Sequence, residues 1–346
     1  MPPTPEQELI LALDVAHQSI KVVAAVRAGG KTVYKRAGIV STMRKGTPAS
    51  LADILYVMKE TTAPWNFQPT SVRVALSGNA ITVRFVSVAK MTKEQLLAEI
   101  KQDSGKYIPV PLADTYIDCD IFPPSPGGKT GEKNIAVIAA VKRDAVADLS
   151  KLLRGMNISA MLLDVSALAV FNAFETYGEI VKTKGFKNYA LIDIGSHTSH
   201  CAILKEGVPV FLRELTVGGS QITEVLAQGM SLEMEKAEAS KKASDSALPM
   251  DTMKPVFQLL TDEISNSCHF FETETTTGVD GVFLTGGAAL TPGLATYIHE
   301  QLETPVEIWN PFESTSIELE EGMVPFKAQG PMFSVCCGLV SRTDKL

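Results

Sequence analysis

Two short segments of the 346-residue chain each place an aspartate at the end of an apolar run, directly before a polar turn: Leu13–Ser19 (LDVAHQS) and Asp193–Ser199 (DIGSHTS). A small residue after the aspartate lets backbone N–H groups approach an anion, and hydroxyl side chains add further donors. A carboxylate at a strand end can hold a hydrated metal ion. The pattern predicts two phosphate-binding turns, with Asp14 and Asp193 holding Mg²⁺ through water.

The predicted phosphate contacts are Asp14, Ala16, His17 and Gln18 in the first turn, and Asp193, Gly195, Ser196, His197 and Thr198 in the second. The first turn has alanine where the second has glycine, and bulky His17 and Gln18 follow it. These side chains could crowd a phosphate, or they could donate hydrogen bonds to it. For either segment alone, the alternative is an ordinary hairpin turn.

The two turns lie in segments of the same design. Ile10–Val26 and Tyr189–Gly207 each read as strand, turn and strand, and a third strand follows each of them, Lys31–Val40 and Val208–Leu215. Placing Asp14 on Asp193 also aligns the apolar residues around them. An internal duplication of one unit predicts two related lobes.

Two glycine pairs could bring bare backbone close to a nucleotide. Gly286, Gly287 and Ala288 follow an apolar strand, and a base or ribose can lie flat against backbone without side chains. Gly218 and Gly219 open an expected helix, whose free N–H groups could meet phosphate.

Glu238 and Lys241 lie three residues apart on an expected helix, and therefore on one face of it. Together they could reach the hydroxyl pair of a ribose. The alternative is a plain surface ion pair.

In this order, the two turns, the Gly-Gly helix start, the AExxK helix (Ala237–Lys241) and the TGG motif resemble the actin-like ATPase superfamily. Further segments resemble the PilM family of type IV pilus assembly proteins, in the FtsA/PilM branch of that superfamily. These segments are Lys106–Pro111 (KYIPVP), Leu162–Phe174, Val217–Glu224 (VGGSQITE) and the CCGLVSR ending. The resemblance implies ATP and Mg²⁺ as cofactors and a cytoplasmic scaffold that is at most a slow ATPase. Relatives that hydrolyse well carry Glu or Gln near position 166, where this chain has Ser166, and its catalytic residues stay unknown.

The alternation of strands and helices predicts an α/β fold. The resemblance implies duplicated, ribonuclease-H-like actin lobes with a strand-helix-strand-strand subdomain inserted in the first. We expect the first lobe at 1–82 plus 164–188, the inserted subdomain at 83–163, the second lobe at 189–220 plus 280–346, and a helical subdomain at 221–279. Within the insertion, Thr92 is expected to cap a helix. Further on, Ser231 is expected to cap a helix that ends near Lys242, and Pro292 to stand in the first turn of another.

The composition disfavours nucleic acid and membrane surfaces as partners. The chain carries 32 Lys+Arg against 39 Asp+Glu, a net charge of −7, which disfavours nucleic acid and a basic membrane-docking patch. Of its five cysteines three are scattered and two are adjacent, with no CxxC pair, which indicates a reducing compartment. The apolar runs are shorter than the ~18 residues that span a bilayer. We therefore expect a cytoplasmic protein without direct membrane insertion.

Because such a protein must reach the envelope through another protein, the resemblance implies a partner: the N-terminal cytoplasmic segment of a PilN-like inner-membrane protein. We expect this segment to bind where the insertion meets the first lobe, so that the chain is peripheral at the inner membrane. Self-association is an alternative role for the insertion. Alternative functions are an FtsA-like division filament protein, disfavoured by the SRTDKL ending, and a metabolic kinase or phosphohydrolase of the same fold.

Overall fold

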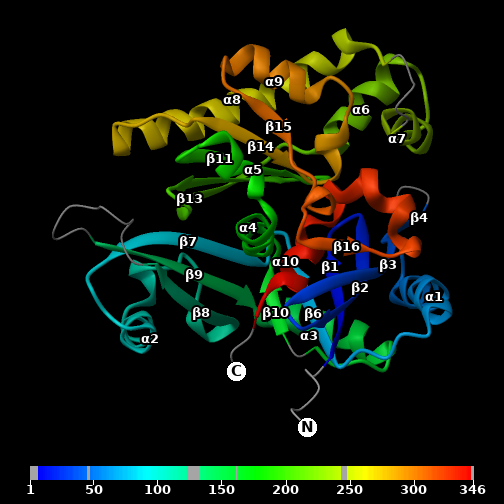
Figure 1. The fold of residues 1–346 in the computed structure, drawn as a ribbon, viewed down its shortest axis with the longest axis horizontal. Helices are drawn as coiled ribbons and strands as arrows, with labels where there is room; N and C mark the ends of the chain where they lie inside the picture. Colours follow the sequence, from blue (N-terminus) through cyan, green and yellow to red (C-terminus); the bar gives the residue numbers. More distant parts are fainter. Residues whose placement is uncertain (1–6, 45–46, 123–132, 161, 243–247, 344–346) are drawn as a thin grey trace.

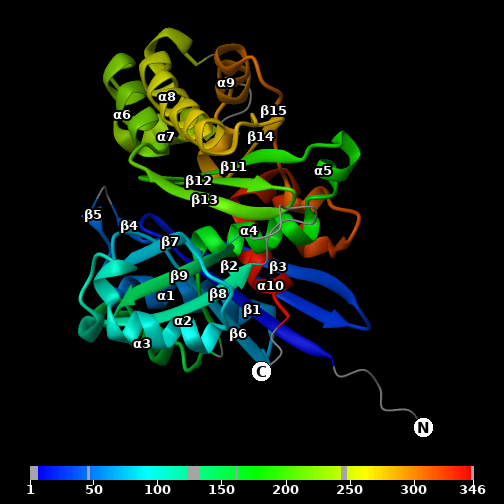
Figure 2. The ribbon, with the colours of Figure 1, turned by 90° about the vertical axis from the view of Figure 1, so that its left-hand side faces the viewer.

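The computed structural model describes residues 7–44, 47–122, 133–160, 162–242 and 248–343. Two lobes, each built on a β-sheet, lie on either side of a central helical layer (Figures 1 and 2). The inserted subdomain lies beside the first lobe, and a group of helices covers the outer face of the second. The last three residues of the SRTDKL ending lie outside the described ranges.

The sheet of the first lobe has the strand order β10-β6-β1-β2-β3-β16. β1 pairs antiparallel with β2, β2 pairs antiparallel with β3, and β6 and β10 extend the sheet in parallel from β1. Alternate side chains of β1 enter two different cores, Ile10 and Ala12 on one face, Leu11 and Leu13 on the other. Both faces are covered, which is why these strands are continuous apolar runs.

The elements of this lobe are β1 (Glu8–Val15), β2 (Ser19–Ala28), β3 (Lys31–Ser41), β4 (Met43–Arg44), β5 (Thr47–Pro48), α1 (Leu51–Thr62), β6 (Ser71–Leu76), β10 (Leu162–Val165), α4 (Ser166–Tyr177) and α5 (Glu179–Lys184). The side chain of Ser50 caps α1 by accepting from the N–H of Asp53.

The sheet of the second lobe repeats this arrangement, with the order β13-β12-β11-β14-β15. In register, Asp14 of β1 faces Lys21 of β2, and Asp193 of β11 faces His200 of β12. The duplication predicted from the two hairpins is therefore confirmed in both topology and register. The strands are β11 (Asn188–Ile194), β12 (Ser199–Lys205), β13 (Val208–Leu215), β14 (Gly281–Thr285) and β15 (Val306–Ile308).

The insertion forms the expected strand-helix-strand-strand unit: β7 (Ile81–Val88), α2 (Lys93–Gln102), β8 (Thr115–Phe122) and β9 (Asn134–Lys142), with sheet order β7-β9-β8. Thr92 caps α2 in a full capping box with Gln95, as predicted. This unit has its own apolar core. The following helix, α3 (Arg143–Gly155), instead packs Leu149 and Leu152 into the outer core of the first lobe, although it falls inside the expected range 83–163.

Two helices fill the space between the lobes. α4 and α10 (Ser334–Ser341) share one apolar cluster with both sheets, including Phe174 of α4, Cys336 of α10 and Phe283 of β14. β16 (Ile317–Leu319) pairs in parallel with β3. The sequence-based division assigns all of 280–346 to the second lobe, and this is wrong for two elements. The structure places β16 in the sheet of the first lobe, where it pairs with the edge of β3 that β2 leaves free. It places α10 against β1, where the apolar VCCGLV run is buried.

The helices of the second lobe are α6 (Gly219–Gly229), α7 (Met234–Lys242), α8 (Met250–Thr275) and α9 (Leu294–Leu302). Two predicted helix starts are wrong. Ser231 has a left-handed backbone (φ 52°), so it cannot be the extended N-cap that was expected, and α7 begins three residues later. α9 begins after Gly293 (φ 82°), whose left-handed turn separates Pro292 from the helix.

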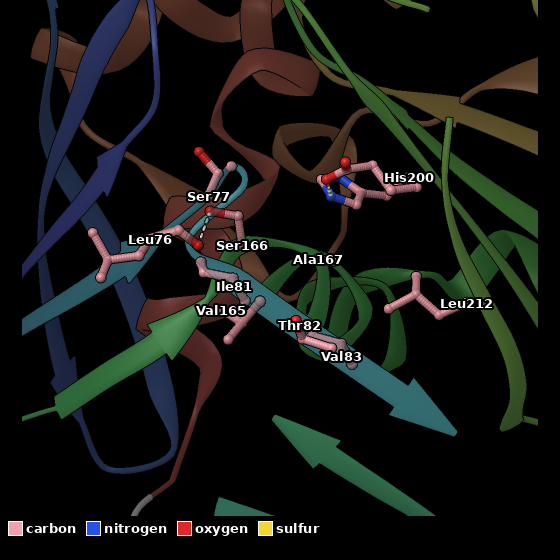
Figure 3. A pocket seen from close by; sticks show the side chains of 12 residues that line it. Leu76, Ser77, Ile81, Thr82, Val83, Val165, Ser166, Ala167, His200 and Leu212 are labelled. Atoms are coloured by element: carbon pink, nitrogen blue, oxygen red, sulfur yellow. Dashed lines mark hydrogen bonds and ion pairs between the residues drawn. The ribbon is translucent and has the colours of Figure 1, made fainter. Parts of the chain in front are cut away.

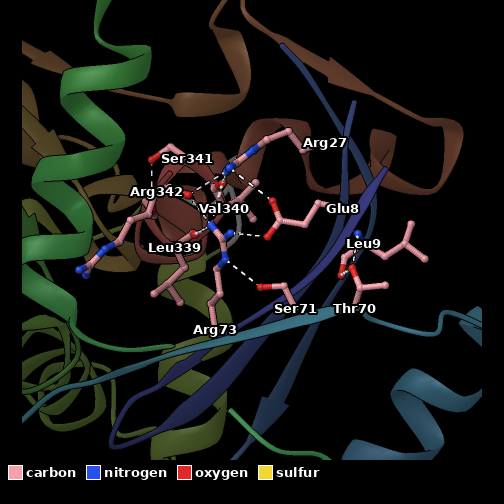
Figure 4. Close-up of polar contacts among 11 residues, drawn as sticks. Glu8, Leu9, Arg27, Thr70, Ser71, Arg73, Leu339, Val340, Ser341 and Arg342 are labelled. Atoms are coloured by element: carbon pink, nitrogen blue, oxygen red, sulfur yellow. Dashed lines mark hydrogen bonds and ion pairs between the residues drawn. The ribbon is translucent and has the colours of Figure 1, made fainter. Parts of the chain in front are cut away.

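Arginines of the first sheet fasten the end of α10 (Figure 4). Buried Arg73 of β6 donates to the carbonyls of Leu339 (2.9 Å) and Arg342 (2.5 Å), and pairs with Glu8 of β1. Arg27 of β2 also donates to the Arg342 carbonyl (3.1 Å). The last carbonyls of a helix lack intrahelical partners and carry partial negative charge, so cations placed there both satisfy them and stabilise the helix end.

Candidate functional site

The tips of the two predicted phosphate hairpins meet in the gap between the lobes. The rings of His17 and His197 lie with their centroids 4.2 Å apart. Thr42 fixes the first tip, because its N–H donates to the carbonyl of Gln18 (3.0 Å) and its hydroxyl to that of His17. The structure therefore brings together two turns that are far apart in the sequence.

A buried lysine lies at the base of the first hairpin. Lys21 Nζ is 2.9 Å from Asp14 Oδ2, and Asp14 is 3 % exposed. Burial alone would lower the pKa of Lys21, but Asp14, and more weakly Asp193, outweigh it and raise the pKa above the ordinary lysine value. Lys21 is thus a permanent cation close to both aspartates of the predicted metal site. Lys21 was not among the predicted site residues, although a lone lysine in an apolar strand (SIKVVAAV) is a signal for it.

The second hairpin carries the equivalent pair. His200 Nδ1 lies 3.9 Å from Asp193 Oδ2, and its Nε2 lies 3.6 Å from Glu214 Oε2 of β13. Burial lowers the pKa of His200, but the two carboxylates raise it to about 9, so the ring is protonated at neutral pH. His200 and Glu214 were not among the predicted site residues.

The start of α6 braces the second hairpin. The N–H of Gly219 donates to the Gly195 carbonyl (2.9 Å), and the N–H of Ser220 donates to the Ser196 carbonyl (2.7 Å). The N–H of Gly218 is held by the side chain of Gln221 (3.0 Å). The expectation of free N–H donors at this helix start is therefore wrong for these three residues, since the hairpin and Gln221 already use them.

The TGG motif closes the site on the side of the second sheet. Gly286 has φ 85°, and a Cβ added to it would lie 2.4 Å from Asp193 Oδ1. A Cβ on Gly219 would lie 2.8 Å from the Cβ of Ala288, and one on Gly218 would lie 2.6 Å from the Ser196 carbonyl oxygen. The glycines are thus required for the close approach of β11, α6 and the TGG turn.

Buried Lys241 and partly exposed Glu238 form a polar network with α6. Lys241 Nζ is 2.6 Å from Glu238 Oε2, and it also donates to the Gly219 carbonyl (2.8 Å) and the Thr223 hydroxyl (2.7 Å). Although burial raises the pKa of Glu238, Lys241 and Thr223 lower it to about 2. Glu238 and Lys241 therefore form an ion pair, which ties α7 to the start of α6.

A cavity of about 220 Å³ lies next to the Asp193–His200 pair, where the first lobe, the insertion and the second lobe meet (Figure 3). Its lining includes Ser77, Val83, Ser166, His200 and Leu212. The hydroxyl of Ser166 donates to the carbonyl of Leu76 (3.0 Å), so it is engaged with the end of β6.

Within the residues that the structure describes, there is no cluster of three or more histidine, cysteine or acidic side chains arranged for a metal ion. Among the same residues, no helix is both long and apolar enough to cross a membrane.

A family model, described as type IV pilus assembly protein PilM, matches residues 12–344. The chain belongs to the PilM family. A solved PilM–PilN type IV pilus biogenesis complex is similar in fold, with a TM-score of 0.79 and 24% identity over 97% of this chain and 98% of that one.

More distant proteins share the fold. MreB5 of Spiroplasma citri bound to AMPPNP has a TM-score of 0.52 at 13% identity, over 96% of this chain and 95% of its own. The ethanolamine utilization protein EutJ of Escherichia coli (strain K12) is 25% identical over 144 residues, which are 42% of this chain and 49% of EutJ. The match thus spans about half the length of this curated relative. The predicted actin-like fold is confirmed.

Proposed function

We propose that this PilM-family protein is a cytoplasmic, actin-like scaffold of type IV pilus assembly, or of a related secretion machine, that binds Mg-ATP between its lobes. It hydrolyses ATP slowly or not at all. It recruits a PilN-like inner-membrane protein through the N-terminal cytoplasmic segment of that protein, and so lies peripherally at the inner membrane. Family membership favours this role over a division filament protein or a metabolic kinase.

The observation that carries the nucleotide proposal is the convergence of five separate chain segments on one gap. The two hairpins, the start of α6, α7 and the TGG turn contact one another through His17–His197, Gly195–Gly219, Lys241–Gly219 and Gly286–Asp193. The backbone of Gly286 and Gly287, which carries no side chain, suits the flat face of a base or ribose. MreB5, which shares the fold, was solved with a bound ATP analogue.

The charged groups of the gap fit a metal-bound polyphosphate. Asp14 and Asp193 would hold Mg²⁺ through its water shell, and the ion would shield the negative charge of the phosphates. Lys21 offers a fixed positive charge beside both carboxylates. We assign the remaining nucleotide contacts to Ala16, Gln18, Ser196, Thr198, Gly287 and Ala288.

Slow turnover is supported by Ser166. Its side chain is buried and donates to the Leu76 carbonyl, so it is not aimed at a water in front of the phosphates. A serine hydroxyl is also a weak base compared with a carboxylate.

Isothermal titration calorimetry with Mg-ATP tests the nucleotide site. The wild-type protein should bind, and Asp193→Ala should weaken binding about 10- to 100-fold, as expected when a group that orients a metal ion is lost. Asp251→Ala, an exposed carboxylate at the start of α8, is the matched control and should bind normally. Absence of binding by the wild type would overturn the site, and turnover at about 10 s⁻¹, the median for enzymes, would overturn the claim of slow hydrolysis.

Hydrogen exchange tests the partner site without removing α3, which the first lobe needs for its core. The N-terminal peptide of the neighbouring PilN-like protein should slow exchange in β7, β9 or β8, where an extended peptide could bury apolar side chains and pair with a strand edge. Protection confined to the second lobe would place the partner elsewhere. Protection at the same strands without peptide, rising with protein concentration, would instead support self-association through the insertion.

A further inference from the structure

Two exposed histidines form the contact between the hairpin tips. His17 comes from the first lobe and His197 from the second, and their rings are tilted by 51° at a centroid distance of 4.2 Å. At that separation no phosphate fits between them. The pair occupies the gap in which the phosphates of a nucleotide would lie.

Four backbone donors around this gap are already in use. The N–H groups of Gly218, Gly219 and Ser220 bond within the protein. In the first hairpin, the N–H of Ala16 donates to the Ser19 carbonyl (3.2 Å). Binding a phosphate through these groups would break existing hydrogen bonds, whereas imidazole rings can turn toward an anion without such a loss.

We propose that His17 and His197 are the paired polyphosphate contacts of this chain: a nucleotide polyphosphate separates the two rings, and each ring then donates a hydrogen bond to it from its own lobe. This rests on the proposed function, because it requires a nucleotide between the lobes. The bulky side chain of His17 then supplies a hydrogen-bond donor from the first hairpin. The polyphosphate joins the two lobes in place of the contact between the two rings.

The geometry links separation of the two rings by a polyphosphate to the protonation of the rings. Two imidazolium rings in contact repel each other, so the pair cannot readily hold both charges while no anion is present. Burial and the nearby His17 lower the pKa of His197, whereas Glu224 of α6 raises it. A polyanion placed between the rings favours both charged forms. Nucleotide binding should therefore take up protons near neutral pH.

Ser196 sets the direction of one ring. Its hydroxyl lies 3.2 Å from Nδ1 of His197 and can donate to it, which places the proton of the neutral ring on Nε2. His197 can then donate to a phosphate in either protonation state, and protonation adds charge to that hydrogen bond.

The test is calorimetric titration of Mg-ATP into the full-length chain at pH 6, 7 and 8, in buffers of different ionisation enthalpy. We compare wild type with the double variant His17→Gln/His197→Gln, which keeps a donor at each position but cannot titrate. His269→Gln, an exposed histidine of α8, is the matched control. Thermal unfolding confirms that each variant is folded. Ionisation of the nucleotide contributes equally to all variants, so the difference between them isolates the two rings.

We expect ATP to bind about 3- to 10-fold more tightly to wild type at pH 6 than at pH 8, with uptake of up to about one proton. The double variant should lose that pH dependence and proton uptake, and adenosine should show neither with any variant. NMR should show His197 titrating at higher pH in the presence of ATP. Equal pH dependence in wild type and double variant, or tighter ATP binding by the double variant at every pH, would overturn the proposal. A wild type that binds no ATP at any pH would overturn the proposed function as well.

Discussion

Each lobe places a base opposite the aspartate of its hairpin, Lys21 opposite Asp14 and His200 opposite Asp193. A buried carboxylate without a partner is costly, so each base supplies its aspartate with an opposite charge. The same cations favour a ligand that carries excess negative charge. A magnesium polyphosphate satisfies this condition better than a free metal ion.

The first residue-scale prediction concerns Lys21. Lys21→Met should destabilise the fold by about 3–5 kcal/mol, because it leaves the carboxylate of Asp14 buried and unpaired. Urea unfolding measures this change. Lys31→Met, at an exposed position in the next strand, should change stability by less than about 0.5 kcal/mol. Equal effects of the two substitutions would show that the Asp14–Lys21 pair does not stabilise the fold.

A second prediction follows from the pKa of Glu238, which is about 2 in the folded protein against an ordinary value of 4.5. A lowered pKa stabilises the fold above pH 4.5, and that stabilisation is lost as the pH falls from 4.5 toward 2. Because the carboxylate is partly exposed, we expect wild type to lose about 1–2 kcal/mol more than Glu238→Gln between pH 5 and pH 3. Exposed Glu235→Gln in the same helix should behave as wild type; parallel pH curves for all three proteins would refute the assignment.

At the scale of elements, α4 and α10 hold the lobes together through unusually close packing. A Cβ added to Gly338 of α10 would lie 1.7 Å from the carbonyl oxygen of Ala169 in α4. That neighbour is helix backbone, which cannot move aside as a flexible side chain could. The small residues of the CCGLV run therefore set the separation of the two helices.

Gly338→Ala should destabilise the protein by about 1–3 kcal/mol or more, since the core must open to admit the methyl group. Gly278→Ala is the matched control: no atom lies within 4 Å of its added Cβ, and its backbone is not left-handed. Denaturant unfolding of the two variants gives the comparison. A Gly338→Ala protein as stable as the control would mean that the helices shift apart without cost.

Local signals in the sequence were sufficient for the hairpins and for the capped helix α2, because a turn or a cap is decided by neighbouring residues. The same kind of signal failed at Ser231 and Pro292, where left-handed turns at Ser231 and Gly293 delay the next helix. Features that depend on contacts between distant segments could not be predicted from the sequence. The pairing of β16 with β3, the contact of His17 with His197, and the use of the α6 N–H groups by the second hairpin all join residues that no local pattern connects.

At the scale of the molecule, the insertion touches both lobes. β7 leaves the first lobe directly after β6 and also lies against β13 of the second (Figure 2). The cavity between them is lined from all three parts, with Val83 on β7, Ser166 on α4 and Leu212 on β13 (Figure 3). His200 and Glu214 also line it, so the second hairpin and the insertion border the same space. A change in the angle between the lobes must therefore alter the surroundings of β7.

This arrangement predicts coupling between the nucleotide and the partner peptide. If ATP changes the affinity for the PilN-like peptide, the peptide must change the affinity for ATP by the same factor, which we expect to be about 5- to 150-fold. Peptide titrations with and without Mg-ATP, and ATP titrations with and without peptide, measure both factors. Asp193→Ala is the control: without nucleotide it should bind the peptide as wild type does, and about 10- to 100-fold more ATP should be needed to reach the same effect on peptide binding. Peptide binding that is the same with and without ATP in the wild type would show that the two sites act independently. It would also show that β7 and the cavity beside it do not couple nucleotide binding to peptide binding.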